Sequence, residues 1–294
     1  MPELPEVEIV VRGLAPLVSG RRVRKVEVFD SKLALRPDDL PQNSTICTVT
    51  RSAKETVFHL VPPGKRKPSL WLCVHLRMTG RLIWSDAPAV DRHRHLRAHI
   101  ILDRGSLSFF DSRRFGILRL LRDLNGAFPS GIDPLGDGFT LERLSELLDG
   151  SRQQIKPWLM RQDRLAGLGN LYASEILHAA RLSPFRMAGE LDWAEVEPLH
   201  RVTRPLLERA IRHCGTTFSD FQDSRGQSGR FRRYLNVYDR EGKPCHRCRT
   251  LIVRVVQQGR STYYCPKCQR VGRISRPTTR RDTLAMSQNQ QVWS

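Results

Sequence analysis

Apolar residues recur at helical spacing near the start of the chain, and short apolar runs follow. Val7, Val10, Leu14 and Leu17 predict an amphipathic helix over residues 5–18. After this helix, strand-like runs are separated by turn signals rich in proline, glycine and aspartate. Many short strands with no helices between them are typical of an antiparallel sandwich or barrel. The runs cover residues 26–29, 46–50, 56–61, 70–76, 99–102, 107–110 and 117–121.

The pattern becomes helical near residue 140. Thr140 can cap a helix that carries Leu141, Leu144, Leu147 and Leu148. Further helices are predicted over about 152–161, 170–181 and 192–213, the last with Gly215 as its stop signal.

The segment between these two regions is rich in glycine, proline and aspartate. Residues 126–138 are therefore predicted to form an interdomain linker. A chain of 294 residues has room for two domains. The sequence thus predicts an α+β protein in which a β-rich domain precedes a helical one.

Positive charge dominates the chain and gathers near its end. The formal net charge is +19, and residues 225–281 hold 16 Lys/Arg against Asp239 and Glu241, which gives that segment +14. Such a balance predicts a polyanionic partner, most commonly nucleic acid. An anionic membrane surface is the competing partner, but no apolar run approaches the ~18–20 residues of a spanning helix. The start of the chain is acidic and resembles no signal peptide. We expect a cytoplasmic, nucleoid-associated protein with no membrane partner.

Four of the seven cysteines have the spacing of a metal site. Cys245, Cys248, Cys265 and Cys268 form two C-x2-C pairs sixteen residues apart. Four thiolates complete a tetrahedral shell and leave no open position, so we expect one structural Zn²⁺. Disulfides are the alternative, but they are rare in proteins that lack a secretory signal.

The first residues can carry covalent chemistry. A small second residue allows removal of the initiator methionine, which would make Pro2 the chain terminus. An α-amino group titrates at about 7.7–8.0, so a terminal proline can attack an aldehyde-like carbon and form an iminium. Glu3 follows, close enough to move protons. An equally good interpretation of these residues alone is a helix start, with proline and acids in the first turn.

A glycine-flanked asparagine lies between two of the predicted helices. In Gly167-Leu168-Gly169-Asn170, the glycines permit close backbone approach and Asn170 is a candidate N-cap. A helix N-terminus presents free N–H groups to an anion, here a DNA phosphate. An ordinary interhelical turn is the simpler interpretation of this segment alone.

Eight motifs together give the chain a family resemblance. It resembles the bacterial formamidopyrimidine-DNA glycosylases, base-excision enzymes for oxidised purines within the formamidopyrimidine-DNA glycosylase/endonuclease VIII family. The resemblance covers residues 1 to about 270. The motifs are MPELPEVE at 1–8, RSAK at 51–54, HLRMTG at 75–80, DSRRFG at 111–116, IKPWLM at 155–160, LGNLYASEIL at 168–177, GTT at 215–217 and the four-cysteine finger.

The resemblance implies a fold and a domain order. We expect an N-terminal antiparallel β-sandwich with a flanking helix, a helix-two-turns-helix domain and a zinc-finger β-hairpin, with DNA bound between the two halves and the damaged nucleotide flipped out. The predicted parts are a catalytic sandwich over 1–125, a linker over 126–139, the helical domain over 140–235, the finger over 236–272 and a disordered basic tail over 273–294.

The resemblance also implies a bifunctional enzyme, a DNA glycosylase that hydrolyses N-glycosyl bonds and an abasic-site lyase. Pro2 matches the nucleophile that attacks C1′, and Glu3 matches the acid/base group. The resulting iminium acidifies the C2′ proton, which makes β- and δ-elimination accessible. Lys54 matches a lysine near the lesion, and Glu6 matches an acid near the base pocket, although a surface carboxylate is an equal alternative for Glu6.

Six further residues match DNA contacts of the family. His75, Asn170 and Arg260 match phosphate contacts, the last at the tip of the finger. Met78, Arg113 and Phe115 match a trio that fills the void left by the flipped base. For Met78 and Phe115 core packing is the ordinary interpretation, but their motifs are predicted to be exposed turns.

Two of the departures from the family's pattern lie inside the quoted motifs. Arg77 stands where the family usually has glycine, and Ser112 stands where it usually has proline.

The leading prediction is a monomeric enzyme that binds double-stranded DNA containing oxidised bases or abasic sites and excises 8-oxoguanine and formamidopyrimidines. The alternatives are an endonuclease VIII-like enzyme for oxidised pyrimidines and a non-catalytic zinc protein that binds damaged DNA. Leu4 favours the purine enzyme, and Pro2-Glu3 disfavours the pure binder.

Overall fold

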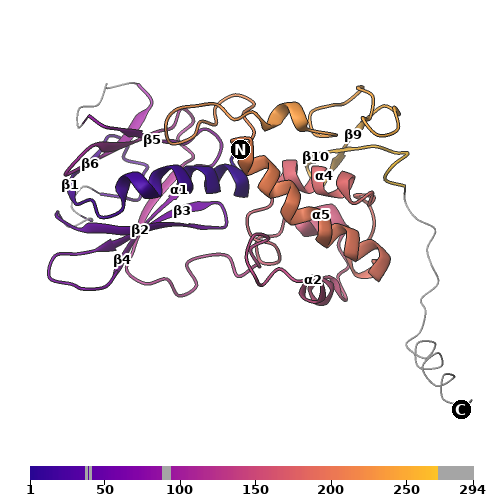
Figure 1. Cartoon of the computed structure of the whole chain (residues 1–294), viewed down its shortest axis with the longest axis horizontal. Coiled ribbons are helices and arrows are strands. Elements are labelled where there is room, and N and C mark those ends of the chain that lie inside the picture. Colours follow the sequence, from indigo (N-terminus) through magenta and orange to yellow (C-terminus); the bar gives the residue numbers. More distant parts are fainter. Residues whose placement is uncertain (37–38, 40–41, 88–93, 271–294) are drawn as a thin grey trace, which may run out of the picture.

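The computed structural model describes residues 1–36, 39, 42–87 and 94–270, and the predicted tail at 273–294 lies outside this part of the chain. The N-terminal half contains two four-stranded antiparallel sheets, which confirms the predicted β-sandwich (Figure 1). Their apolar faces share one buried core. One sheet has the order β1 (Val23–Val28), β6 (Leu96–Leu102), β7 (Ser106–Phe110), β5 (Arg81–Ser85); the other has β2 (Thr45–Ser52), β3 (Glu55–Val61), β4 (Leu70–His75), β8 (Ile117–Leu121).

Helix α1 (Leu4–Val18) lies along this sandwich, as its periodicity predicts. Val10, Leu14 and Val18 pack into the sandwich core. Figure 1 shows the start of α1, at the chain's N-terminus, lying where the sandwich meets the helical half. The first residues of the chain are therefore placed between two folded bodies.

The helical half contains α2 (Leu141–Leu148), α3 (Ile155–Leu159), α4 (Asn170–Ala179) and α5 (Trp193–Arg212), together with the short 3-10 helices η2 (Ala188–Glu190) and η3 (Phe231–Tyr234). The Thr140 hydroxyl accepts a hydrogen bond from the Arg143 N–H, which confirms the predicted cap of α2. At the end of α5, Gly215 donates to the Ala210 carbonyl while Cys214 takes a left-handed φ of 59°. This Schellman geometry ends the helix one residue before the predicted stop.

The finger is a separate antiparallel hairpin of β9 (Val253–Gln257) and β10 (Arg260–Tyr264). Its small core holds Val237, Ile252, Cys245 and Cys265. The Gln269 side chain donates to the Leu182 carbonyl, just beyond α4, at 3.0 Å. The finger is therefore docked against the helical half. Among the described helices, none has the length and apolar composition needed to cross a membrane.

Each half of the molecule contributes a side chain to the core of the other. Leu4, the first residue of α1, is fully buried in the helical core. Phe221, from the segment that follows α5, is buried in the sandwich core. Apolar burial therefore fixes the two halves relative to each other at the start of α1.

Replacing Leu4 with alanine tests this link. Leu4→Ala should lower the free energy of unfolding by about 2–5 kcal/mol, because it leaves a cavity in a core that cannot fully collapse. Urea denaturation followed by circular dichroism measures the change. Leu251→Ala is the matched control, since Leu251 is 58% exposed; equal effects of the two substitutions would contradict the assigned role of Leu4.

Candidate active site

The Glu3 carboxylate occupies the N-terminus of helix α4. It is 3% exposed and accepts hydrogen bonds from the N–H groups of Gly169 at 2.7 Å, Leu171 at 3.0 Å and Tyr172 at 3.4 Å. The helix dipole and these donors stabilise a buried negative charge. The anion at this helix end is thus a side chain of the protein, so the N–H groups expected to face a DNA phosphate are already engaged.

The glycines before α4 make this contact possible. A Cβ added to Gly169 would lie 2.5 Å from the Glu3 carboxyl carbon, and one added to Gly167 would lie 2.8 Å from the Leu4 Cβ. Gly167 also has a φ of +95°, which favours glycine. The N-cap of α4 is Gly169 rather than Asn170, so the predicted cap was wrong. Because Glu3 supplies the hydrogen-bond acceptors, the cap residue needs no side chain.

Glu6 is a second buried carboxyl group one turn further along α1. It accepts hydrogen bonds from the Glu3 N–H at 2.9 Å, the Tyr172 hydroxyl at 2.6 Å and the Thr216 N–H at 2.8 Å. Burial raises the pKa of Glu6 to about 7, against the lowering effect of these hydrogen bonds. Burial and the neighbouring Glu6 also raise the pKa of Tyr172. Glu6 is therefore a buried junction between α1, α4 and the segment after α5, and not a surface carboxylate.

A cavity of about 450 Å³ opens beside these carboxylates. It brings together six of the predicted site residues, which are Pro2, Glu3, Glu6, Met78, Asn170 and Arg260. A neighbouring cavity of about 260 Å³ contains Lys54 and His75. Met1 and Arg260 line both cavities. Eight predicted residues from five different motifs therefore converge on one region, whereas Arg113 and Phe115 line neither cavity.

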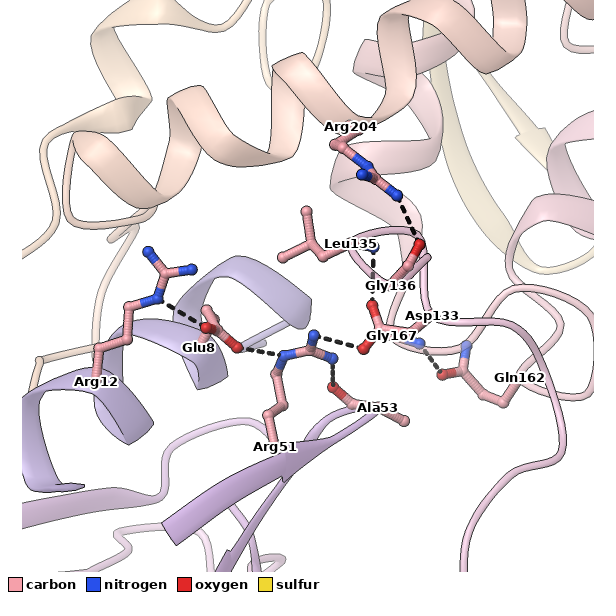
Figure 2. Close-up of polar contacts among 10 residues, drawn as sticks. All are labelled: Glu8, Arg12, Arg51, Ala53, Asp133, Leu135, Gly136, Gln162, Gly167 and Arg204. Carbon is pink, nitrogen blue, oxygen red and sulfur yellow. Dashed lines mark hydrogen bonds and ion pairs between the residues drawn. The ribbon is translucent and has the colours of Figure 1, made fainter. Parts of the chain in front are cut away.

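Lys54 is held at the turn between β2 and β3. Burial lowers its pKa, while the nearby Glu3 raises it. The preceding strand is fixed by Arg51, whose side chain is 6% exposed and whose guanidinium binds Glu8 of α1 at 2.7 Å and Asp133 at 2.6 Å. The same guanidinium donates to the Ala53 carbonyl at 3.3 Å, as Figure 2 shows. The Lys54 turn is thus anchored to both halves of the molecule.

His75 is neutral at physiological pH. Burial and the cations Arg77 and Lys54 lower its pKa to about 4. Its Nδ1 accepts a hydrogen bond from the Arg77 N–H at 3.0 Å, so the proton of the neutral ring lies on Nε2. The ring can therefore donate one hydrogen bond to a phosphate oxygen.

Asn170 connects α4 to the finger. Its amide donates to the Ser261 carbonyl at 2.9 Å, and its Oδ1 accepts from Lys156 Nζ at 2.6 Å. Burial and the cation Arg260 lower the pKa of Lys156 to about 8. Lys156 was missed as a site residue in the sequence, although it lies in the IKPWLM motif. These contacts place Arg260, the neighbour of Ser261, at the rim of both cavities.

The predicted void-filling trio lies on two adjacent turns. Met78 is 40% and Phe115 is 52% exposed, so neither is a core residue. The Arg113 guanidinium lies 4.8 Å from the Phe115 ring centroid. The buried Asp111 carboxylate joins the turns, because it accepts from the Thr79 hydroxyl on one and from the Arg113 and Gly116 N–H groups on the other.

Arg77, in the first of these turns, has the left-handed backbone conformation that glycine favours. Its φ is 54°, in the left-handed region, which costs a non-glycine residue about 1 kcal/mol. The hydrogen bonds of the Arg77 N–H to His75 and of the Gly80 N–H to the Leu76 carbonyl hold the turn in place. The departure from glycine therefore adds strain to the turn before Met78.

The four cysteines of the finger have the arrangement that a tetrahedral metal requires. Their sulfur atoms all lie within 4.8 Å of one another. Zn–S bonds of about 2.3 Å imply sulfur–sulfur distances of roughly 3.8 Å. Two of the pairs, Cys248–Cys265 and Cys245–Cys268, are 3.4 Å and 4.0 Å apart. The residues therefore fit one structural zinc ion, as the spacing predicts.

Comparisons with known proteins cover nearly the whole chain. Three family models match it: "Formamidopyrimidine-DNA glycosylase N-terminal domain" over residues 1–118, "Formamidopyrimidine-DNA glycosylase H2TH domain" over 130–222 and "Zinc finger found in FPG and IleRS" over 242–271. The formamidopyrimidine-DNA glycosylase of Pelotomaculum thermopropionicum is 41% identical, across 92% of this chain and 100% of the relative. That of Rhizorhabdus wittichii is 40% identical with the same coverage.

Solved structures show the same architecture. The MutM (Fpg) protein of Thermus thermophilus has a TM-score of 0.79 and 37% identity, covering 92% of this chain and 100% of that one. A Lactococcus lactis Fpg variant in complex with Fapy-dG-containing DNA has a TM-score of 0.81 and 28% identity, with the same coverage. The sequence motifs, the two-half fold and these likenesses agree. The chain belongs to the formamidopyrimidine-DNA glycosylase family.

Proposed function

We propose that this protein excises oxidised purines, 8-oxoguanine and formamidopyrimidines, from duplex DNA and then cleaves the strand at the abasic site. The observation that carries the proposal is the shared cavity of Pro2 and Glu3, in which a carboxylate is fixed by backbone donors beside the second residue of the chain. Relatives of the family support it, because solved structures include MutM with 8-oxo-G-containing DNA and Lactococcus lactis Fpg with abasic-site DNA.

Pro2 is the proposed nucleophile. Removal of Met1, which lines the same cavity, would free the secondary amine and open space beside it. The amine nitrogen forms a bond to C1′ as the bond from C1′ to the base breaks, and the departing base takes a proton from water. The proton lost by the amine passes to the Glu3 carboxylate, which returns it to O4′ as the sugar opens to the iminium. Loss of the C2′ proton then expels the 3′ phosphate, and a second elimination expels the 5′ phosphate.

The polar and cationic side chains around the cavities are proposed to hold the DNA backbone. Lys54, His75, Asn170 and Arg260 come from four different segments and lie in the two adjoining cavities. A phosphate bound there would contact side chains from both halves of the molecule and from the finger. Met78, Arg113 and Phe115 are proposed to enter the duplex where the damaged nucleotide leaves. Met78 and Phe115 are exposed apolar side chains on rigid turns that can replace a lost stacking partner, and Arg113 can pair with the orphaned opposite base.

We further propose that a monomer is the working form and that it acts in the cytoplasm on nucleoid DNA. One chain supplies both cavities, both carboxylates and the finger, so the chemistry needs no second copy. The zinc ion, when bound, holds the hairpin that carries Arg260 and adds no chemical step.

Covalent trapping tests the nucleophile. Borohydride reduction during reaction with DNA containing 8-oxoguanine opposite cytosine should give an adduct whose mass maps to Pro2. An N-terminal tag that prevents Met1 removal should abolish trapping and leave DNA binding nearly unchanged, because only the amine is blocked. The same tag at the C-terminus is the control. Absence of an adduct with Met-processed protein, on this DNA and on abasic DNA, would show that the proposed chemistry is wrong.

The pKa of Glu6 predicts a pH-dependent effect on stability. Because burial raises this pKa from its ordinary value of 4.5 to about 7, the native state holds a proton that the unfolded chain loses between those two values, and stability falls as pH rises through that window. Glu6→Gln cannot ionise, so its unfolding free energy relative to wild type should rise by up to roughly 3 kcal/mol between about pH 5 and pH 8.

Urea denaturation at both pH values measures this difference. Glu142→Gln on the exposed face of α2 is the control and should show no such trend. A Glu6→Gln effect that is equal at the two pH values would contradict the raised pKa.

A further inference from the structure

The last turn of helix α4 contacts the cysteine cluster of the finger. The helix lies beside β10, as Figure 1 shows. His178, in this last turn, is 2% exposed, and its Nε2 lies 3.5 Å from the sulfur of Cys245, which is itself fully buried. The His178 carbonyl accepts a hydrogen bond from the Arg247 guanidinium of the finger at 3.2 Å. One helical residue therefore holds the finger through its backbone and contacts a metal ligand with its ring.

A bound metal determines the direction of the contact between the ring and the sulfur. A cysteine bound to Zn²⁺ is a thiolate, which has no proton and can only accept a hydrogen bond. A neutral imidazole carries its proton on one ring nitrogen and accepts with the other. With the proton on Nε2, the His178 ring donates to Cys245, whereas the other tautomer would place two electron pairs against each other. The zinc-loaded protein therefore favours the tautomer with the proton on Nε2.

Buried thiolates need such donors. Four thiolates and one Zn²⁺ carry a net negative charge, and Cys245 and Cys265 lie in the buried core of the finger. Burial of charge without hydrogen-bond partners is unfavourable. The Cys265 sulfur accepts from the Cys268 N–H at 3.4 Å, a donor that belongs to the finger itself. His178 instead offers Cys245 a donor from the helical half, outside the finger.

We propose that His178 is a positioning residue of the zinc site, whose Nε2–H donates to the Cys245 thiolate and so raises the affinity of the finger for zinc. The hydrogen bond stabilises the metal-bound thiolate and holds its sulfur in place, so the metal is lost less readily. Zinc binding and the end of α4 are thereby coupled. The inference concerns metal retention and does not depend on the reaction proposed at the other end of α4.

Zinc competition with the coloured chelator pyridylazoresorcinol tests the proposal in the full-length protein. His178→Phe and His178→Leu remove the donor, and each should lower the affinity for Zn²⁺ by about 10- to 100-fold, the usual effect of losing an outer-shell partner. His178→Gln can place an amide N–H near the position of Nε2 and should recover most of the affinity. His246→Phe is the matched control, because His246 is adjacent to Cys245 in the chain but exposed.

Cobalt substitution gives a second measurement, which a change in packing alone would not alter. A hydrogen bond lowers the energy of a sulfur lone pair. Its loss should therefore move the thiolate-to-Co²⁺ charge-transfer band of His178→Phe to longer wavelength than in the wild-type protein and in His178→Gln.

Two results would contradict the proposal. One is wild-type zinc affinity in both variants that lack the donor. The other is an equal loss of affinity in His178→Phe, His178→Leu and His178→Gln with no shift of the cobalt band, which would assign the ring a packing role only.

Discussion

The contact between the Glu3 carboxylate and the start of helix α4 determines where every other part of the site can lie. A carboxylate buried without partners would be strongly destabilising, but three N–H donors and the positive end of a helix offset that cost here. The contact fixes the second residue of the chain at the edge of a cavity. It also requires Leu4 to enter the helical core and Gly167 and Gly169 to lack side chains. The proposed acid/base group is thus also a structural cap.

The same helix extends this constraint to the finger. From the first turn of α4, Asn170 reaches Ser261 on β10, and Lys156 reinforces that bond from α3. Further along, Glu175 accepts hydrogen bonds from the N–H groups of Asn236, Val237 and Tyr238, which lead into the finger. Arg260 therefore takes its position from α4 as well as from the metal site. Because these contacts share one short helix, small changes at its N-terminus would shift both Pro2, the proposed nucleophile, and the finger.

Local pattern was enough to predict those parts of the structure that depend on local causes. The α1 periodicity, the Thr140 cap and the strand at 117–121 follow from the residues themselves, and the cysteine spacing predicted a cluster that the fold brings together. Strand β5 was missed because only Leu82 of its five residues is buried, so no alternation marks it. The convergence of Lys54, His75 and Arg260 was predicted through motif resemblance, since their proximity depends on long-range packing. The N-cap prediction for Asn170 was wrong for the same reason. The N–H groups at the start of α4 are bound by the Glu3 carboxylate, which reaches them only through long-range packing.

The charge distribution explains how acids and a polyanion can share one site. The chain carries a net charge of +19, yet its proposed reaction centre contains two buried carboxyl groups. Backbone N–H donors shield the Glu3 carboxylate, and burial raises the pKa of Glu6 to about 7, so neither presents a full, unshielded charge to an approaching phosphate. Burial lowers the pKa of Lys54 and Lys156, and Arg260 lowers both further. A phosphate bound among these cations would remove the mutual repulsion and raise both pKa values. If the DNA backbone binds there as proposed, phosphate binding and protonation of the two lysines are one coupled equilibrium, and each favours the other.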